Sequence, residues 1–284
     1  MPIDIDLKKD FFFLLKKEFH SFGIEIETSI PLDEIPFLYY NFIKRRITPK
    51  PREILKANDF SCPIGLLAGL ENLANKIIAG DNLTPHLSKR VSKNLESVDY
   101  LLNDWNIHHM HLGTNIYNGF VERTDPVLFC MVTDSIIYFI SMKCHGEWSD
   151  ISLLKTVYSN WPELIEPHIL SGVVSTIHKP TDEDICKLRK GNVNTIIELA
   201  SNVVIKSPGG GYATDGTSND VVRERNNAMR ILSSLEEKIK SEEKSIRKQI
   251  ISDNKTPART LKFELKNINN NFIVYEIYSK MFFC

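Results

Sequence analysis

Apolar residues recur at helical spacing through the first part of the chain. The spacing predicts helices over residues 5–22, 32–46, 64–79 and 97–105, and a further helix from 84 to about 91. Gly80 ends the third of these helices, and Pro49 and Pro51 prevent the second from continuing past Arg46. Only a short extended piece is expected, over residues 24–30. The region 1–95 is therefore predicted to be mostly helical.

Two continuous apolar runs, residues 127–132 and 136–143, mark the centre of the chain. The first run is apolar on both faces, which is typical of a central strand covered on both sides, and residues 133–135 supply a tight turn into the second run. A third strand is expected over 107–112, and a helix is expected to begin near Leu153. The region 96–170 is thus predicted to be a three-stranded antiparallel sheet with flanking helices.

The region 171–284 combines short elements with one long helix. A capping box of Thr181 and Asp184 begins a helix predicted over 181–191. The other expected elements are a short helix over 163–170, an extended segment over 172–177, strands over 195–199 and 203–206, a charged helix from 218 to about 250, and a β-hairpin across the Asn-rich segment 267–271. The fold class expected is α+β: a helical N-terminal region, a small central antiparallel sheet flanked by helices, and a C-terminal long helix plus β-hairpin.

Composition narrows this picture only slightly. The 35 basic and 36 acidic residues nearly cancel, so any charged partner must be bound by a local patch. Five widely spaced cysteines without a CxxC pair argue against a disulfide framework or a cysteine-based zinc ribbon. The first residues carry acids and lysines around a short apolar core, unlike a secretory signal or a membrane helix of about 20 apolar residues. A cytoplasmic protein that does not bind a membrane is expected.

Candidate chemistry is concentrated in residues 103–161, which hold four of the eight histidines and all three tryptophans. Because side chains alternate along a strand, His109 and His111 share one face and His108 points to the other. Lys143 and His145 follow where the second apolar run ends. The sequence thus predicts that His109, His111, Lys143 and His145 converge, together with Arg123 from the preceding connector.

The order helix, strand, connector, strand, turn, strand, helix over about 98–161 resembles RelE-type (barnase/RelE-like) ribonuclease toxins. The positions that match the basic and imidazole side chains of such toxins are His109, His111, Arg123, Lys143 and His145. The resemblance implies RNA cleavage without a metal or other cofactor, and an antitoxin or partner protein. The segments NDWNIHHMHLG, HGEW and NWPEL are also similar to a block in uncharacterised bacterial proteins associated with mobile elements and phage defence.

The first functional hypothesis is a metal-independent endoribonuclease, acting as a bacterial toxin or phage-defence effector. Such cleavage needs a base, an acid and cations that hold the charged transition state, and histidine suits the first two roles near neutral pH. His109 or His111 is the expected base, His145 the acid, and Arg123 and Lys143 the phosphate ligands. Tyr117 or Trp148 is expected to stack on a base.

Two alternatives use the same residues. His109 and His111, with His145 or Cys144, have the composition of a three-ligand zinc site, for which Asp104 and Glu147 are the nearby carboxylates. Otherwise the histidines hydrogen-bond backbone at a strand edge, and HGEW is only a turn before a helix. The second functional hypothesis is a non-enzymatic nucleic-acid or protein binding or assembly component of a defence or mobile-element system.

The loop SPGGGYATDGTSND precedes the long helix, and its three glycines at 209–211 would let backbone amides approach a phosphate. It matches neither dinucleotide-binding nor P-loop spacing, so a flexible loop that caps the helix is the competing interpretation. Tyr212 and Thr217 are candidate substrate contacts if the loop folds over the histidines. The thin apolar stripe of the long helix suggests a homodimer, although a helix packed on its own domain fits equally.

Overall fold

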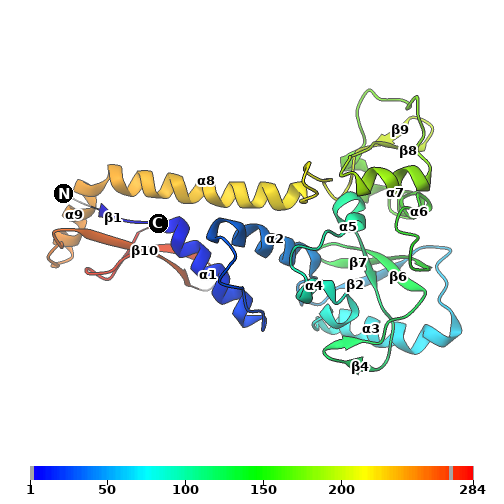
Figure 1. The fold of residues 1–284 in the computed structure, drawn as a ribbon, viewed down its shortest axis with the longest axis horizontal. Coiled ribbons are helices and arrows are strands. Elements are labelled where there is room, and N and C mark those ends of the chain that lie inside the picture. The colour runs from blue at the N-terminus through cyan, green and yellow to red at the C-terminus, as the bar shows by residue number, and fades with distance from the viewer. Residues whose placement is uncertain (1–2, 269–270, 284) are drawn as a thin grey trace. The chain divides into compact units, whose positions relative to one another are not determined.

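The computed structural model describes residues 3–268 and 271–283. The chain divides into two compact units, one formed by Met1–Tyr40 with Arg223–Cys284 and the other by Asn41–Val222 (Figure 1). This division differs from the three consecutive regions 1–95, 96–170 and 171–284, because the first strand of the chain pairs with a strand that begins at Leu261. The α+β fold class is confirmed: helices and several small sheets alternate, and a long helix precedes the last strands.

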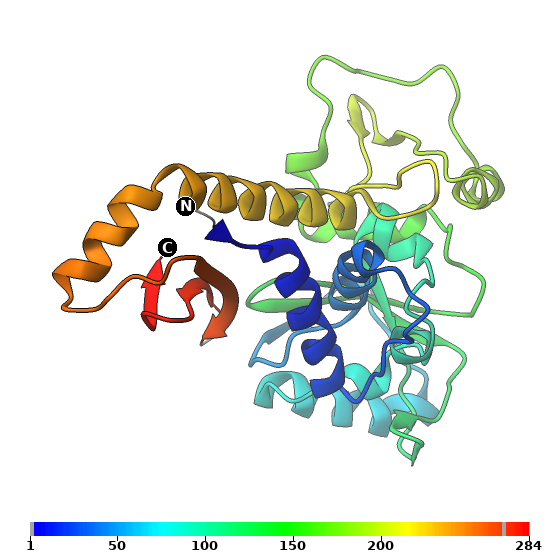
Figure 2. The same cartoon turned by 60° about the vertical axis from the view of Figure 1, so that its left-hand side comes forward.

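The first unit contains a four-stranded sheet in the order β1-β10-β11-β12 (Figure 2). Its strands are β1 (Ile3–Asp4), β10 (Leu261–Ile268), β11 (Asn271–Glu276) and β12 (Met281–Phe283). The predicted hairpin is confirmed in the antiparallel pair β10 and β11, and the expected Asn-rich turn between them lies partly outside the described residues. Helix α1 (Leu7–Ser21) packs against β10 and buries Leu7, Phe11, Leu15 and Phe19, the predicted apolar stripe.

Three more helices contribute to this unit. The 3-10 turn η1 (Leu32–Glu34) leads into α2 (Ile35–Arg45), and α8 (Asn219–Ser241) is followed by α9 (Glu243–Ser252). The single helix expected from 218 to about 250 is interrupted at Glu242. Helix α9 buries Ile246 and Ile250, so the apolar stripe continues across the interruption. Both α2 and α8 supply residues to each of the two units.

The second unit contains a four-stranded sheet in the order β2-β7-β6-β3. The strands β3 (Ile107–Met110), β6 (Val127–Val132) and β7 (Ile136–Lys143) form the predicted antiparallel sheet. A fourth strand, β2 (Glu53–Lys56), joins parallel to β7 and was not predicted. Three of its four residues are exposed, so it carries neither the alternation nor the apolar run by which strands are recognised.

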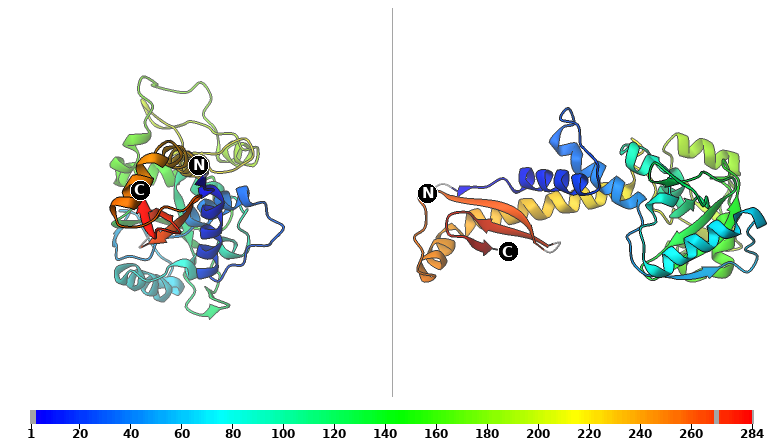
Figure 3. Two further views of the ribbon diagram at one scale, coloured as in Figure 1. Left: turned by 90° about the vertical axis from the view of Figure 1, so that its left-hand side faces the viewer. Right: turned by 90° about the horizontal axis from the view of Figure 1, so that it is seen from below.

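Helices cover this sheet. Helix α3 (Leu67–Ala79), preceded by η2 (Ile64–Leu66), packs against β2, and α6 (Ser152–Asn160) packs against β7 (Figure 3). Helix α5 (Tyr100–Trp105) begins at an Asp99 cap and leads into β3. The helix expected from 84 to about 91 is wrong: extended backbone at Leu87 separates the 3-10 turn η3 (Thr84–His86) from the short α4 (Arg90–Lys93).

Smaller elements complete the second unit. The predicted capping box of Thr181 and Asp184 begins α7 (Asp182–Lys190), and the predicted strands are β8 (Ile197–Ala200) and β9 (Val203–Ile205). This unit also contains a short hairpin of β4 (Ile116–Tyr117) and β5 (Phe120–Val121). Two 3-10 turns follow α6, namely η4 (Pro162–Leu164) and η5 (Glu166–His168). The described segments 24–30 and 172–177, for which extended pieces are expected, form no strand. Within the described residues, no helix has the length and apolar composition needed to cross a bilayer.

Candidate functional site

The rings of three histidines and one tryptophan gather beside the end of β3. His109 lies 4.6 Å from Trp148 between ring centroids, and His111 stacks on His145 at 5.2 Å. His109 lies in β3 and His111 directly follows the end of that strand at Met110, and their ring centroids are 6.3 Å apart. His145 and Trp148 arrive from the turn after β7. The structure therefore brings together three of the histidines singled out in the sequence, and Trp148 with them.

Arg123 joins this cluster through His145. Its Nη2 lies 3.1 Å from His145 Nε2, and since a guanidinium has only donors, Nε2 accepts this hydrogen bond. The proton of the neutral imidazole is therefore on Nδ1, which lies 3.7 Å from a carboxylate oxygen of Asp125. The same oxygen accepts a hydrogen bond from the backbone N–H of His145 at 3.0 Å. Asp125 thus fixes both the position and the orientation of this histidine.

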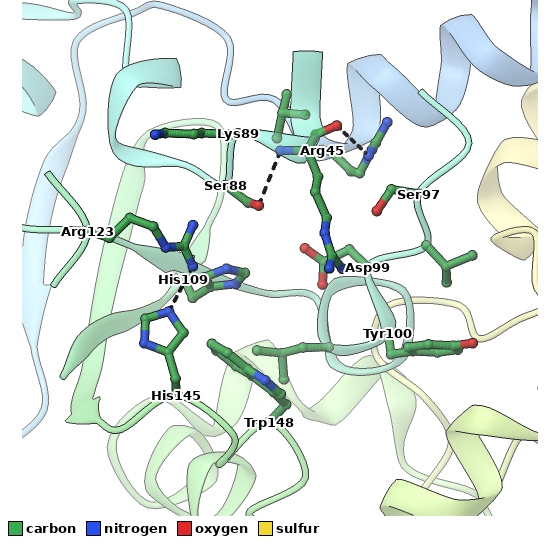
Figure 4. A pocket seen from close by; sticks show the side chains of 14 residues that line it. Arg45, Ser88, Lys89, Ser97, Asp99, Tyr100, His109, Arg123, His145 and Trp148 are labelled. Carbon is green, nitrogen blue, oxygen red and sulfur yellow. Dashed lines mark hydrogen bonds between the residues drawn. The ribbon is translucent and has the colours of Figure 1, made fainter. Parts of the chain in front are cut away.

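A cavity of about 550 Å³ opens onto the cluster. Figure 4 shows Arg123 and Lys89 on one side of it, Asp99 and Tyr100 on the other, and Trp148 with His145 beneath. The volume falls in the range of roughly 300–1,000 Å³ that is typical of small-molecule sites. The cavity is therefore large enough to hold a substrate group against His109.

The cavity wall is rich in cations. Arg45 is used internally, since its guanidinium donates to the carbonyl oxygens of Asn41, Arg90, Asn94 and Leu95, and burial lowers its pKa to about 10. Within the part of the chain that the structure describes, the side chains of Lys89 and Arg90 make no hydrogen bond or ion pair. Together with Arg123 they give the cavity three cations suited to an anion and one carboxylate, Asp99.

His109 has the properties of a neutral base. Burial lowers the pKa of its imidazole, Asp99 partly opposes that shift, and the neighbouring His145 and Arg123 lower the pKa further. Its Nδ1 atom is buried without a hydrogen-bond partner in the described residues. The ring lines the cavity. Because Nδ1 is buried, Nε2 is the atom at which an unprotonated ring in this position can accept a proton from a bound substrate.

His111 is held differently and does not fit the role of base. Its Nδ1 atom accepts a hydrogen bond from the backbone N–H of Thr124 at 3.1 Å, so the proton of the neutral ring is on Nε2. Burial, followed by the charge of Arg123, lowers its pKa to about 3. The expectation that either His109 or His111 could be the base is therefore narrowed to His109. His111 fixes the connector that carries Arg123.

His86, a buried residue that the sequence analysis did not single out, holds His111 in place. His86 and His111 exchange hydrogen bonds: the His111 N–H donates to the His86 carbonyl at 2.8 Å, and His86 Nδ1 donates to the His111 carbonyl at 2.9 Å. Lys76 Nζ donates to His86 Nε2 at 3.1 Å, and burial lowers the pKa of His86. In the sequence, Pro85 and His86 indicated only the start of a helix. The pairing of His86 with His111 could not be seen, because the two residues are 25 positions apart.

Lys143 and Tyr117 do not line the cavity. Lys143 lies in β7 opposite Val127 of β6, on the predicted face of the sheet. Strand β6 lies between β7 and β3, so Lys143 is two strand spacings, or about 10 Å, from β3. Its ammonium forms an ion pair with Asp150 at 2.5 Å. Tyr117 lies in the β4–β5 hairpin, where 58% of its surface is exposed. Neither residue therefore has the expected place at the site.

The glycine-rich loop packs on α5 and does not fold over the histidines. The amides of Gly209 and Gly211 donate to the carbonyls of Asp104 and Asn103 at 2.7 and 2.8 Å, and Gly210 N–H donates to Ser207 at 3.1 Å. These three amides are consequently not directed at a phosphate, which removes that alternative for the loop. Tyr212 and Thr217, the candidate substrate contacts, do not line the cavity.

Tyr212 instead anchors the loop. Its side chain is buried, and its hydroxyl donates to the Tyr100 carbonyl at 3.2 Å. Burial strongly raises the pKa of this hydroxyl, so it remains a neutral donor. The tyrosine therefore contributes to the position of α5, which borders the cavity.

A buried ion pair holds Trp148 in place and was not anticipated. Arg189 Nε donates to Asp104 Oδ2 at 2.9 Å, and the guanidinium lies 4.0 Å from the Trp105 ring centroid. The other side of the guanidinium donates to the backbone carbonyl of Trp148. Arg189 and Asp104 are 85 residues apart, so no local pattern connects them. Trp148 is thereby anchored through its backbone, and its ring remains at the cavity.

The two carboxylates considered for a metal site have other partners. Asp104 is paired with Arg189, and Glu147 accepts the backbone N–H of Cys144 at 2.6 Å. Among the described residues, no three His, Cys, Asp or Glu side chains are arranged to hold a metal ion together.

Comparison of the chain with models of protein families, with curated proteins and with solved structures gives no match. The resemblance of residues 98–161 to RelE-type toxins accordingly remains an expectation based on element order and the placement of polar residues.

Proposed function

We propose that the protein is a metal-independent endoribonuclease in which His109 is the general base, His145 the general acid and Arg123 the principal phosphate ligand. The observation that carries the proposal is the convergence of these three side chains and Trp148 on one cavity bordered by Lys89 and Arg90. A role as a bacterial toxin or phage-defence effector, with an antitoxin or partner protein, rests on the resemblance of the central block alone.

The proposed reaction begins when unprotonated His109 removes the proton of an RNA 2′-hydroxyl. The 2′-oxygen then attacks the adjacent phosphorus, the bond from phosphorus to the 5′-oxygen breaks, and protonated His145 gives its proton to that oxygen. The Asp125 carboxylate lies 3.7 Å from Nδ1 of this ring. Once Nε2 carries a proton it no longer accepts from Arg123, so the guanidinium is available to the charged phosphate.

Cleavage of single-stranded RNA by the purified protein tests this proposal. We expect cutting in the presence of a chelator, and a loss of about 100-fold to 10,000-fold in rate for His109→Ala and for His145→Ala, the usual contribution of one acid or base. His178→Ala is the matched control, because His178 is exposed and lies outside the cavity. No cutting by the wild-type protein would contradict the proposal, and so would undiminished cutting by the double variant that combines His109→Ala with His145→Ala. Loss of wild-type cutting when chelator is added would favour a metal.

Binding of RNA without cleavage would support the second hypothesis, a non-enzymatic binding or assembly component. In that case the cationic wall of the cavity would bind the RNA. Neither the wild-type protein nor the alanine variants would give cleavage products. A homodimer through α8 and a cytoplasmic location remain separate expectations. The molar mass of the protein in solution tests the first of these directly.

A further inference from the structure

The shape of the cavity restricts how an RNA could reach His109. The cavity is bounded by residues from separate segments, including Lys89, Asp99, Arg123 and Trp148, and Figure 4 shows these side chains arranged around His109. At about 550 Å³ the space corresponds to one small-molecule ligand. A base-paired nucleotide remains stacked in a helix that proteins read from the outside, whereas an unpaired nucleotide can be turned into a pocket.

The chemistry of the wall differs from one side to the other. Arg123, next to His145, and Lys89, further from it, lie on one side and offer charged donors that suit a phosphate (Figure 4). Trp148 presents its ring at the base of the cavity, with its backbone fixed by Arg189, and Tyr100 borders the opposite side. An aromatic face next to a cationic end matches a nucleotide, which has a planar base and an anionic phosphate.

We propose that the cavity binds one unpaired nucleotide of a single-stranded RNA, with its phosphate on Arg123 and its base stacked on Trp148. This inference rests on the proposed ribonuclease function and adds the class of substrate. It requires that the protein act on single strands or loops, and that a mononucleotide bind more tightly than phosphate or nucleoside alone.

Tryptophan fluorescence measures the binding part of this proposal. Trp105 and Trp161 are buried, so Trp148 is the tryptophan at the cavity. We expect adenosine 3′-monophosphate to quench the emission and to bind at least about 10-fold more tightly than inorganic phosphate or adenosine, since stacking and charged hydrogen bonds both contribute. Arg123→Ala should weaken nucleotide binding by about 10-fold to 100-fold and leave adenosine binding unchanged. Equal affinities for nucleotide and phosphate, or no binding of either, would overturn the proposal.

The base-stacking part is tested by Trp148→Leu, which leaves the backbone carbonyl that Arg189 holds. Nucleotide affinity should fall about 10-fold or more, while Tyr117→Leu, at an exposed aromatic outside the cavity, should have no effect. Circular dichroism verifies that both variants are folded. Arg123 is exposed, and its guanidinium hydrogen-bonds to His145 at the surface of the site. Arg123→Ala therefore gives an independent result if Trp148→Leu does not fold.

Cleavage separates this inference from the function on which it rests. A 12-nucleotide RNA should be cut at least about 100-fold faster as a single strand than in a duplex with its complement. Equal rates on both forms would overturn the unpaired-nucleotide proposal and leave the ribonuclease function intact. Tight nucleotide binding with quenching of Trp148, but no cleavage of either RNA, would give the reverse result. The cavity would then be a nucleotide site, and the proposed ribonuclease activity would be wrong.

Discussion

The histidines of the central block differ in their hydrogen-bond partners, and the partners separate their roles. His109 has a buried Nδ1 atom without a partner in the described residues, whereas the Nδ1 atom of His111 is occupied by the Thr124 amide. His145 is placed between Arg123 and Asp125. A histidine whose lone pair already accepts a backbone hydrogen bond contributes to structure first, because its use as a base would break that bond.

The low pKa of His111 predicts a pH-dependent stability. Its folded pKa, about 3, lies below the value near 6.5 expected in the unfolded chain, so the unfolded state binds a proton more readily. Stability from this residue is complete above pH 6.5 and is lost as the pH falls towards 3. Between pH 7 and pH 5 the loss is on the order of 2 kcal/mol. Urea unfolding of the wild-type protein at the two pH values measures the sum of this loss and the losses from other buried histidines, such as His108, whose pKa burial lowers to about 4.

His111→Asn isolates this contribution. The asparagine oxygen can accept the Thr124 N–H in place of Nδ1 and does not titrate, so the difference in unfolding free energy between pH 7 and pH 5 should shrink by about 2 kcal/mol. His178→Asn is the control in the same unit, at an exposed histidine. A variant that retains the full pH dependence of the wild type would show that His111 is not the source.

At the scale of elements, the glycine-rich loop acts as a close-fitting connection to α5. A Cβ atom at Gly209 would lie 2.2 Å from the Leu102 carbonyl oxygen and 2.5 Å from that of Asn103, so no other residue fits without displacing the helix end. The same helix supplies Asp104 to Arg189, which holds Trp148. The loop therefore supports the position of the cavity wall from a distance.

Gly209→Ala is expected to destabilise the protein by about 1–3 kcal/mol or more, the usual cost of overpacking a filled site. Gly65→Ala is the matched control, because a Cβ atom at Gly65 meets nothing within 4 Å and its backbone is not left-handed. It should be neutral or stabilising by up to about 1 kcal/mol. Thermal unfolding compares the two variants, and equal stabilities would contradict the close fit.

At the scale of the whole molecule, each unit has its own core and can be followed by its own signal. All three tryptophans belong to the unit Asn41–Val222, whereas Phe11 is buried in the other unit and lies 5.4 Å from the ring of Phe272. Tryptophan fluorescence therefore reports on the second unit, and far-ultraviolet circular dichroism reports on both. Separate cores allow separate cooperative transitions.

Phe11→Ala should destabilise its own unit by about 3–5 kcal/mol, the usual cost of removing a buried aromatic ring. We expect the circular dichroism transition to move to lower urea while the fluorescence transition stays in place. Phe13→Ala is the control on the same helix, since 45% of the Phe13 surface is exposed. Parallel shifts of both signals would show that the two units unfold as one.

Local patterns in the sequence were sufficient for much of the fold. The stripe of Phe11 and Phe19 predicted α1, the apolar runs predicted β6 and β7, and Thr181 with Asp184 predicted the start of α7. These signals are local because helical periodicity, strand alternation and capping each depend on residues only a few positions apart. Strand β2, whose residues are mostly exposed, lacked such a signal and is defined by its pairing with β7.

The sequence by itself determined that His109 lies in a strand of the central sheet and that His145 follows the last strand, whereas β3 ends at Met110 and His111 lies just beyond it. Tertiary structure decided which groups are already engaged: the Thr124 amide donates to His111, the Lys143 ammonium pairs with Asp150, and two of the loop glycine amides donate to carbonyls of α5. It also joined Arg189 to Asp104 and the first strand to β10. Such partners are chosen by contacts between distant segments, and periodicity contains no information about them.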